Sequence, residues 1–220
     1  MGAAESKSTE SEIRRITDAL EPSIVVEAAY AGMVSEQQAR RVWLCDAADA
    51  LPGRVTFAAL CAQHANAPTP QIDLPLDATQ AIKFTGGTTG AAKGVMQPYR
   101  AWMANIVNQI HAWEITEHDR YVMAAPIMHG TSTYVLPILS QDTFLHRGGT
   151  MCFMPPTLVY MLMGLPGASR TDYPQLRRLI YGGASMPPEK VRAVRDFFGP
   201  VLGTTYGQTE APQILTVMRP

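Results

Sequence analysis

The sequence predicts an α/β protein with parallel-rich sheets and flanking helices. Two observations lead to this fold class. Short apolar runs recur along the chain and end in glycine-rich or polar segments, and between them lie longer stretches with apolar residues at helical spacing. The clearest unit covers residues 178–205, where strand, helix and strand follow one another at the spacing that a right-handed parallel crossover requires.

The composition is that of an ordinary globular protein. Of the 220 residues, 46% are hydrophobic and 17% are charged, which excludes disordered and collagen-like classes. Eighteen basic residues against nineteen acidic ones give a net charge of -1, so we expect no nucleic-acid partner. The longest uncharged stretch, residues 148–169, is interrupted by prolines and glycines and predicts a turn and helix, so we expect no transmembrane segment.

Cysteine usage and the N-terminus together favour a cytoplasmic location. Cys45, Cys61 and Cys152 are odd in number and widely spaced, with no C-x-x-C pair, which predicts free thiols in a reducing compartment. The first fifteen residues are polar and lack the apolar core of a secretory signal.

The chain divides into three parts by composition and pattern. Residues 1–11 form a polar tail, residues 12–80 an N-terminal α/β segment with a linker, and residues 81–220 the core segment. Within the second part we expect a helix, a buried strand, a short strand and a proline-containing linker at residues 12–20, 23–30, 41–45 and 64–77, respectively.

The core segment shows regular alternation of strands and helices. Its expected strands are residues 81–85, 121–128, 178–181 and 201–205. Its expected helices are residues 98–113, 132–139, 157–163 and 187–198. If the last three strands are parallel neighbours, the polar segments after them open on one edge of the sheet, where ligands of such sheets bind.

The glycine-rich segment after the first of these strands is the most informative part of the sequence. It reads TGGTTGAAKG, and glycine backbone, threonine hydroxyls and a lysine together suit a polyphosphate. It is neither a Walker A loop, because Ala92 and Gly94 flank the lysine, nor a G-x-G-x-x-G motif. The alternative is a flexible turn with no ligand. The candidate phosphate-binding residues are Thr85, Gly86, Gly87, Thr88, Thr89, Gly90 and Lys93.

A second polar segment, YGQTE, follows the last expected strand. The ring of Tyr206 suits stacking on a base, the hydroxyl of Thr209 suits a phosphate oxygen, and the carboxylate of Glu210 suits Mg²⁺. Alone the motif is weak, because a tyrosine at a strand end is often core and a glutamate is often simply exposed.

The motifs TGGTTGAAKGV, YGGAS and YGQTE, in this order, resemble those of the adenylate-forming (AMP-binding) superfamily, and within it the AMP-forming acyl-CoA synthetases or fatty-acid–CoA ligases. The resemblance is strong over residues 81–220 and weaker from Glu12 onward. It implies that the fold is part of the large N-terminal domain of such an enzyme. It also implies ATP, Mg²⁺ and, as second substrate, coenzyme A.

The resemblance assigns roles to residues of this sequence. The catalytic residues that it implies are Lys93, Thr209, Glu210 and His129, the histidine lying beside an acyl pocket that Gly130 and Thr131 also line. The metal residues are Glu210 and Thr85. The nucleotide-binding residues are Thr85, Gly86, Gly87, Thr88, Thr89, Gly90, Lys93, Gly182, Gly183, Ala184, Tyr206, Gly207, Gln208 and Thr209.

The implied reaction joins two anions in its first step. A carboxylate, from a fatty or aryl acid, attacks the α-phosphorus of ATP to give acyl-AMP and pyrophosphate, and the thiol of coenzyme A then displaces AMP. Catalysis of the first step would rest on positioning and charge neutralisation.

Family members continue past YGxTE to a T-G-D motif, an arginine hinge and a small C-terminal domain, none of which occurs in these 220 residues. We therefore expect an N-terminal fragment that binds nucleotide weakly and does not turn over. The alternative is a catalytically inactive nucleotide-binding or interaction module derived from an adenylation domain.

A serine-hydrolase interpretation is the third alternative. The segment around Ser185 nearly forms a G-x-S-x-G elbow, but Pro187 replaces the last glycine and no acidic residue followed by histidine comes later in the chain. Ser185 is better interpreted as a residue at the start of the following helix.

Overall fold

The computed structural model describes residues 11, 13, 16, 23–26, 41–44, 55–85, 93–124, 130–139, 148–211 and 213–220. The chain divides into two compact units, Gly2–Leu74 and Pro75–Pro220. The boundary lies within the proline-containing stretch that we expected to be a linker. The α/β fold class is confirmed.

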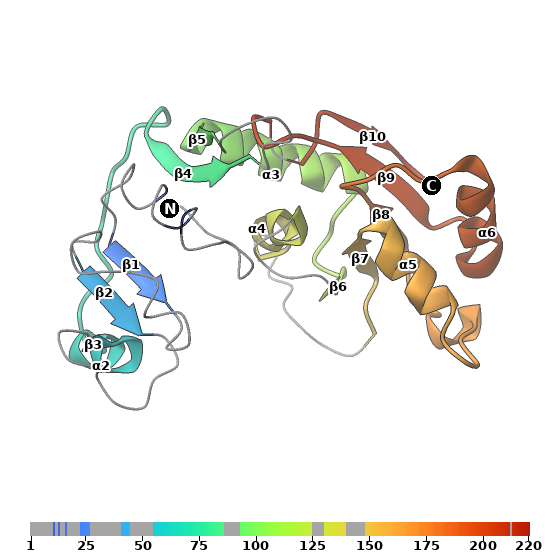
Figure 1. The fold of residues 1–220 in the computed structure, drawn as a ribbon, viewed down its shortest axis with the longest axis horizontal. Helices are drawn as coiled ribbons and strands as arrows, with labels where there is room; N and C mark the ends of the chain where they lie inside the picture. The colour runs from blue at the N-terminus through green and yellow to red at the C-terminus, as the bar shows by residue number, and fades with distance from the viewer. Residues whose placement is uncertain are drawn as a thin grey trace. The chain divides into compact units, whose positions relative to one another are not determined.

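The Gly2–Leu74 unit contains a small parallel sheet (Figure 1). Its strands β1 (Ser23–Val26), β2 (Arg41–Leu44) and β3 (Val55–Thr56) pair in that order. Helix α2 (Phe57–Gln63) follows at once, and the hydroxyl of Thr56 caps it by accepting a hydrogen bond from Ala59 N at 3.1 Å. The sequence predicted β1 and β2 but neither β3 nor α2. The expected helix at 12–20 lies mostly outside the described residues.

A five-stranded sheet forms the centre of the Pro75–Pro220 unit, in the order β10-β9-β8-β7-β6 (Figure 1). Four of its strands run parallel to one another and β10 runs antiparallel to β9. This confirms the prediction of a parallel-rich sheet. The strands are β6 (Tyr121–Met123), β7 (Met151–Met154), β8 (Arg178–Tyr181), β9 (Leu202–Tyr206) and β10 (Thr216–Met218).

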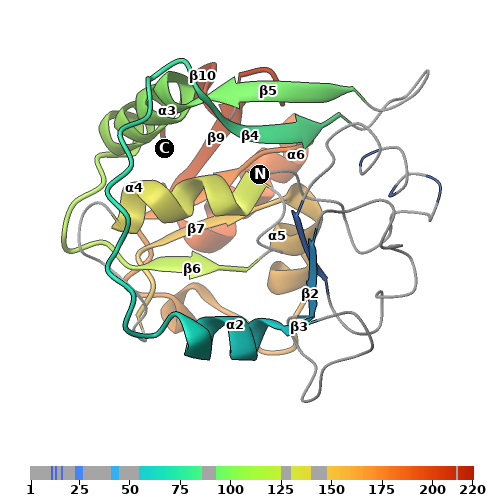
Figure 2. The ribbon, with the colours of Figure 1, turned by 90° about the vertical axis from the view of Figure 1, so that its left-hand side faces the viewer.

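Helices cover both faces of this sheet (Figures 1 and 2). One face packs against α3 (Tyr99–Trp113), the 3₁₀ helix η2 (Gly130–Tyr134) and α4 (Val135–Leu139), and the other against α5 (Pro156–Met163) and α6 (Pro188–Phe198). A hydrophobic core lies on each face of the sheet. Successive side chains of β7 point to opposite faces, so Phe153 packs in the first core and Cys152 in the second. Burial on both faces explains why β7, Met-Cys-Phe-Met, is apolar without interruption.

One strand of this sheet was not predicted. Strand β7 lies between β6 and β8, so of the last three predicted strands only β8 and β9 are direct parallel neighbours. Its four residues, Met-Cys-Phe-Met, form a short apolar run that periodicity alone does not distinguish from a helix. The expected strand at 121–128 ends at Met123, and residues 125–128 lie outside the described part of the chain.

The glycine-rich segment occupies a hairpin rather than a strand-to-helix turn. Strand β4 (Thr79–Phe84) pairs antiparallel with β5 (Gly94–Pro98) in a separate two-stranded sheet, and α3 begins directly after β5. The sequence predicted β4 and α3 but not β5. Only five residues separate Lys93 from the helix, and the last of them, Pro98, was assigned to the expected helix at 98–113.

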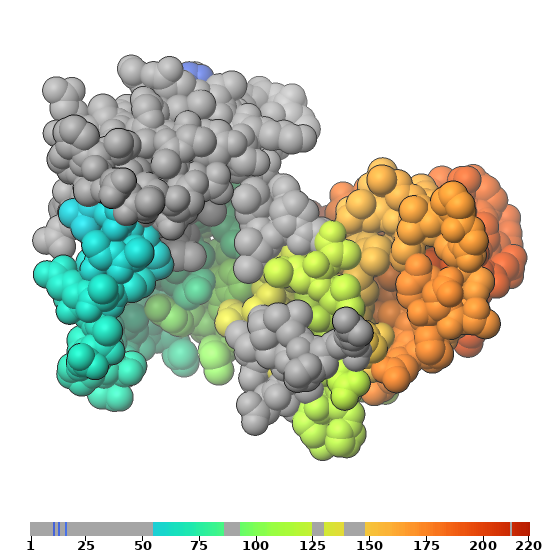
Figure 3. Space-filling model, turned by 90° about the horizontal axis from the view of Figure 1, so that it is seen from below, coloured from blue at the N-terminus to red at the C-terminus, as the bar shows by residue number. Residues whose placement is uncertain are grey.

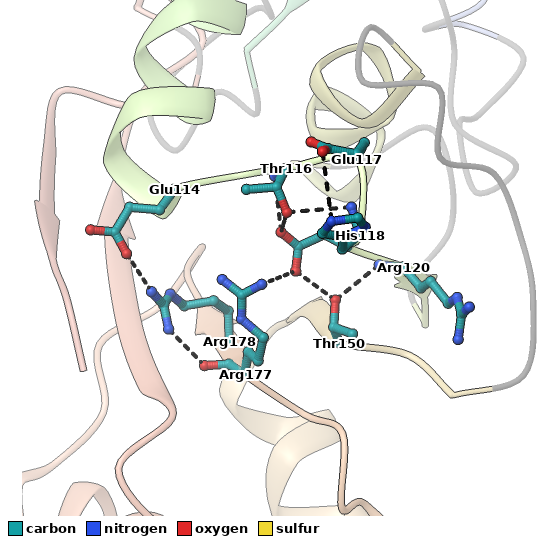
Figure 4. A network of polar contacts seen from close by, with 9 residues as sticks. Glu114, Thr116, Glu117, His118, Arg120, Thr150, Arg177 and Arg178 are labelled. Carbon is teal, nitrogen blue, oxygen red and sulfur yellow. Dashed lines mark hydrogen bonds and ion pairs between the residues drawn. The ribbon is translucent and has the colours of Figure 1, made fainter.

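A buried carboxylate holds the amino edge of the five-stranded sheet together (Figure 4). Oδ1 of Asp119 accepts hydrogen bonds from Thr150 Oγ1 at 2.7 Å and Arg177 Nη1 at 3.1 Å, and Oδ2 accepts one from Thr116 N at 3.0 Å. The partners come from the turn before β6 and from the residues just before β7 and β8. This network therefore lies at the edge opposite the carboxyl ends of the strands.

Several large apolar side chains are exposed on the Pro75–Pro220 unit. Met161 and Leu165 expose 67% and 54% of their surface and belong to the orange segment in Figure 3. Among the residues that the structure describes, no helix has both the length and the apolar character needed to cross a bilayer.

Candidate nucleotide site

Two hydrogen bonds close the base of the glycine-rich loop. The amide of Thr85 donates to the carbonyl of Lys93 at 3.0 Å, and the amide of Lys93 donates back to the hydroxyl of Thr85 at 3.2 Å. Lys93 itself is exposed. The loop between them lies outside the described residues, and with it the predicted contacts Gly86, Gly87, Thr88, Thr89 and Gly90.

A buried glutamine on β5 connects this hairpin to the second predicted segment. Nε2 of Gln97 donates to the carbonyl of Thr209 at 2.5 Å, while its Oε1 accepts from the indole Nε1 of Trp102 at 3.1 Å. The Nζ of Lys83 lies 4.8 Å from the centre of the Trp102 ring. Partial burial lowers the pKa of Lys83.

The segment after β9 forms a tight turn that carries the predicted phosphate and metal residues. Gln208 and Ala211 exchange backbone hydrogen bonds of 3.1 and 3.2 Å, and the two residues between them, Thr209 and Glu210, lie at the tip. Tyr206, at the end of β9, is 54% exposed, so one side of its ring is available to a ligand. Within the described part of the chain, the exposed carboxylate of Glu210 pairs with no cation.

Gly207 is required by close contact with the returning chain. A Cβ at this position would lie 2.6 to 2.7 Å from backbone atoms of Gln213, closer than real Cβ atoms approach other atoms. The same Gln213 lies against η2, since a Cβ at Gly130 would be 3.2 Å from its Oε1. Thr205 Oγ1 donates to the Gln213 carbonyl at 2.6 Å. Gln213 therefore holds the strand end, the turn and η2 together.

The segment after β8 lies beside the turn after β9, because the two strands are parallel neighbours with Tyr181 opposite Thr204. A Cβ at Gly182 would lie 3.0 Å from the ring of Phe153, so a side chain there would displace the core. Gly183 is exposed and has a φ of +81°, a conformation that favours glycine. Ala184 follows and is exposed as well.

The predicted acyl-pocket residues are only partly visible. His129 lies outside the described residues. Thr131 is fully buried, and its hydroxyl lies 2.8 Å from the hydroxyl of Tyr121, whose pKa is raised by burial. The Thr131 hydroxyl thus contacts a neutral phenol of the core.

The structure brings Thr85 and Lys93 into one unit with residues 206–210, and places residues 182–184 at the same sheet edge.

Sequence reasoning missed Gln97 and Gln213. For Gln97 the only signal was a polar residue within the apolar run that follows Lys93, and for Gln213 there was none.

The donor set fits Mg²⁺ held jointly with phosphates. In the ranges that the structure covers, no three His, Cys, Asp or Glu side chains gather into a ligand set of their own. A single exposed carboxylate, Glu210, beside a hydroxyl residue is the kind of protein contribution that Mg²⁺ takes when substrate phosphates and water supply its other ligands.

The fold is that of an α/β protein in which the hairpin of the glycine-rich segment and the turn after β9 are joined by a hydrogen bond. The chain belongs to the AMP-binding enzyme family, whose profile matches residues 3–220.

Among the relatives, a medium/long-chain-fatty-acid–CoA ligase, FadD8 of Mycobacterium tuberculosis, is 25% identical over 180 residues, covering 74% of this chain and 32% of the relative. A feruloyl-CoA synthase of Amycolatopsis sp. is 27% identical, covering 68% and 34%. A 2-succinylbenzoate–CoA ligase of Bacillus velezensis is 28% identical, covering 72% and 35%. The chain thus spans about a third of the length of these curated relatives.

Solved structures share the fold. ATP-bound MatB from Rhodopseudomonas palustris superposes with a TM-score of 0.81 at 23% identity, over 98% of this chain and 46% of that one. A long-chain-fatty-acid–CoA ligase, FadD1 of Archaeoglobus fulgidus, gives 0.80 at 18% identity, over 100% and 49%. The expected resemblance to adenylate-forming enzymes and to their N-terminal fold is confirmed.

Proposed function

We propose that these residues form the ATP-binding part of an acid–CoA ligase, which converts a carboxylic acid to acyl-AMP and then to its CoA thioester. The observation that supports this is the hydrogen bond from Gln97 to the Thr209 carbonyl. It links the hairpin that carries the glycine-rich loop to the turn that carries Thr209 and Glu210, so both segments face a common ligand.

The hairpin would bind the β- and γ-phosphates. Its loop begins at Thr85 and ends at Lys93, with the two residues tied backbone to backbone. The exposed ammonium of Lys93 adds a positive charge at the loop base, where charge on the departing pyrophosphate must be neutralised.

The carboxyl edge of the sheet would hold the rest of the nucleotide. The ring of Tyr206, a residue that is 54% exposed, would stack on adenine, and residues 182–184 border the same edge with little side-chain bulk. The hydroxyl of Thr209, at the tip of its turn, would orient the α-phosphate for in-line attack by the carboxylate. Bound Mg²⁺, held by Glu210 with Thr85 as second contact, would neutralise phosphate charge.

The acid and coenzyme A are assigned by similarity. The acyl group would lie near His129 and Gly130, and relatives act on fatty, feruloyl and succinylbenzoyl acids by name, so a fatty or aryl acid is proposed. The proposed setting is the cytoplasm, consistent with two described cysteines that are both free thiols.

Isothermal titration of the chain with ATP in the presence of Mg²⁺ tests the proposal. We expect binding that weakens by about tenfold or more in Lys93→Ala, because a charge-assisted contact to phosphate is worth roughly 1.5 to 3 kcal/mol. Lys190→Ala is the matched control, since that exposed lysine on α6 lies over the ring of Tyr160 on α5. Absence of binding, or equal affinity in the Lys93 variant, would contradict the proposal.

Carboxylate-dependent ATP–pyrophosphate exchange tests whether these residues suffice for adenylation. With about a third of the relatives' length, the chain is expected to bind nucleotide without robust exchange. Binding without exchange fits both a ligase segment and an inactive nucleotide-binding module. Robust exchange would show that these residues suffice for adenylation.

A further inference from the structure

Gln97 is almost completely buried, with 2% of its surface exposed, and both ends of its carboxamide are engaged. The indole N–H of Trp102 can only donate and the backbone carbonyl of Thr209 can only accept. The carboxamide therefore fits in one orientation, with Oε1 toward Trp102 at 3.1 Å and Nε2 toward Thr209 at 2.5 Å.

We infer that Gln97 is a positioning residue, which fixes the Thr209–Glu210 turn at a set distance from the phosphate-binding hairpin. This inference rests on the proposed function. Strand β5 carries both the loop end at Lys93 and, four residues on, Gln97, and it is paired with β4 over most of its length. A turn bonded to this strand keeps its place relative to the loop base.

The turn needs such an anchor because its other bonds are local. Gln208 and Ala211 bond to each other, and the nearby bond from Leu215 N to the Tyr206 carbonyl lies within the same returning segment. Of the described hydrogen bonds, the one from Gln97 joins Thr209 to a residue 112 positions away. Without it the partly buried Thr209 carbonyl would lose its donor.

Trp102 holds the carboxamide of Gln97 in place by donating a hydrogen bond to its Oε1. The indole is 8% exposed on the first turns of α3, and the ammonium of Lys83, on β4, lies over its ring at 4.8 Å. The carboxamide from β5 is thus held by an indole from α3, and a lysine from β4 lies over that indole.

The experiment uses the full chain and three variants at this site. Gln97→Leu removes the donor. Gln97→Glu keeps the shape and in its ionised form presents only acceptor oxygens to the Thr209 carbonyl. Trp102→Phe frees the other end of the carboxamide while leaving the bond to Thr209. Gln109→Leu is the matched control, because Gln109 is equally buried and also donates to a backbone carbonyl, that of Thr133 at 3.1 Å, away from the turn.

The first measurement is amide hydrogen exchange, which needs no nucleotide. We expect the amides of Gln208 and Ala211 to exchange about fivefold faster or more in Gln97→Leu and Gln97→Glu, by a smaller factor in Trp102→Phe, and at the original rate in Gln109→Leu. Unchanged exchange in both Gln97 variants, or an equal rise in Gln109→Leu, would overturn the inference. If Gln97→Leu does not fold, Trp102→Phe decides the same question.

The second measurement is the affinity for Mg²⁺-ATP and, separately, for inorganic triphosphate with EDTA. We expect Gln97→Leu to weaken Mg²⁺-ATP about fivefold and triphosphate by less than about twofold, because only the former uses the turn. The Lys93→Ala variant shows whether the site binds Mg²⁺-ATP as proposed. If it binds more weakly, and Gln97→Leu exchanges faster at the turn yet keeps its affinity for Mg²⁺-ATP, the positioning role is overturned. If the unaltered chain binds no ATP, the proposed function fails, and the exchange rates alone decide whether Gln97 positions the turn.

Discussion

The hydroxyl of Thr85 accepts a hydrogen bond from the backbone amide of Lys93 at 3.2 Å, across the mouth of the glycine-rich loop. This contact ties the side chain of the residue before the loop to the backbone of the residue after it.

Loss of that hydroxyl should loosen the loop base. We expect Thr85→Val to weaken Mg²⁺-ATP binding about fivefold, because one hydrogen bond contributes about 1 kcal/mol, whereas Thr85→Ser should bind as the unaltered chain does. Thr79→Val, at the far exposed end of β4, is the control. Isothermal titration measures all three, and equal affinity for Thr85→Val and Thr85→Ser would show that the hydroxyl has no role.

Gly207→Ala should destabilise the sheet edge. The new methyl would lie within 2.7 Å of the Gln213 backbone, so the turn and the returning chain must separate. We expect the free energy of unfolding in urea to fall by about 1 to 3 kcal/mol, with weaker nucleotide binding. In Gly164→Ala the methyl meets its nearest atoms at 3.4 Å, an ordinary contact, and stability should change by less than about 0.5 kcal/mol. Similar losses in both variants would refute the steric argument.

Tyr206→Ala tests stacking on adenine. Because stacking of a base on an aromatic ring is worth about 1 to 3 kcal/mol, Mg²⁺-ATP should bind about 5- to 100-fold more weakly while inorganic triphosphate binds unchanged. Tyr206→Phe keeps the ring and loses only the hydrogen bond from Gln208 Nε2 to the phenol oxygen, so its affinity should stay near the original. A comparable loss for triphosphate would indicate damage to the turn instead.

Asp119→Ala should cost about 2 to 4 kcal/mol in the free energy of unfolding. The carboxylate is completely buried and accepts bonds from Thr116, Thr150 and Arg177, and its removal leaves those donors without an acceptor (Figure 4). Glu117→Ala removes an exposed carboxylate two residues away and should change stability by less than about 0.5 kcal/mol. Urea unfolding measures the stability of both variants. If Asp119→Ala is as stable as the unaltered chain, Asp119 does not stabilise this edge of the sheet.

The two described cysteines should differ in reactivity. Cys61 is exposed, whereas Cys152 is buried and its pKa is raised to about 12 by that burial. A raised pKa keeps the thiol protonated at pH 8, and only the thiolate reacts. Peptide mass spectrometry after maleimide treatment at pH 8 should find Cys61 modified and Cys152 unmodified, with both modified in urea. Equal labelling of the folded chain would show that Cys152 is accessible.

Much of the Pro75–Pro220 unit follows from local pattern. Helix α6 and strand β8 appear at or within a residue of their expected bounds, because a proline start, an apolar face and a glycine stop are encoded locally. The motifs at residues 85–93 and 206–210 likewise predict phosphate binding from their residue types alone, since glycine backbone, threonine hydroxyls and a lysine suit a polyphosphate.

Only the tertiary structure decided which strands pair. Strands β5 and β7 escaped prediction because runs of only five and four residues carry too little periodicity to distinguish a strand from another conformation, and partner strands decide between them. The same holds for Gln97: its sequence position, within an apolar run, says nothing of a carbonyl 112 residues away. The sequence by itself determined which chemical groups are present and most local elements, and the tertiary structure decided which of those groups meet, because such contacts depend on strand order and packing between distant segments.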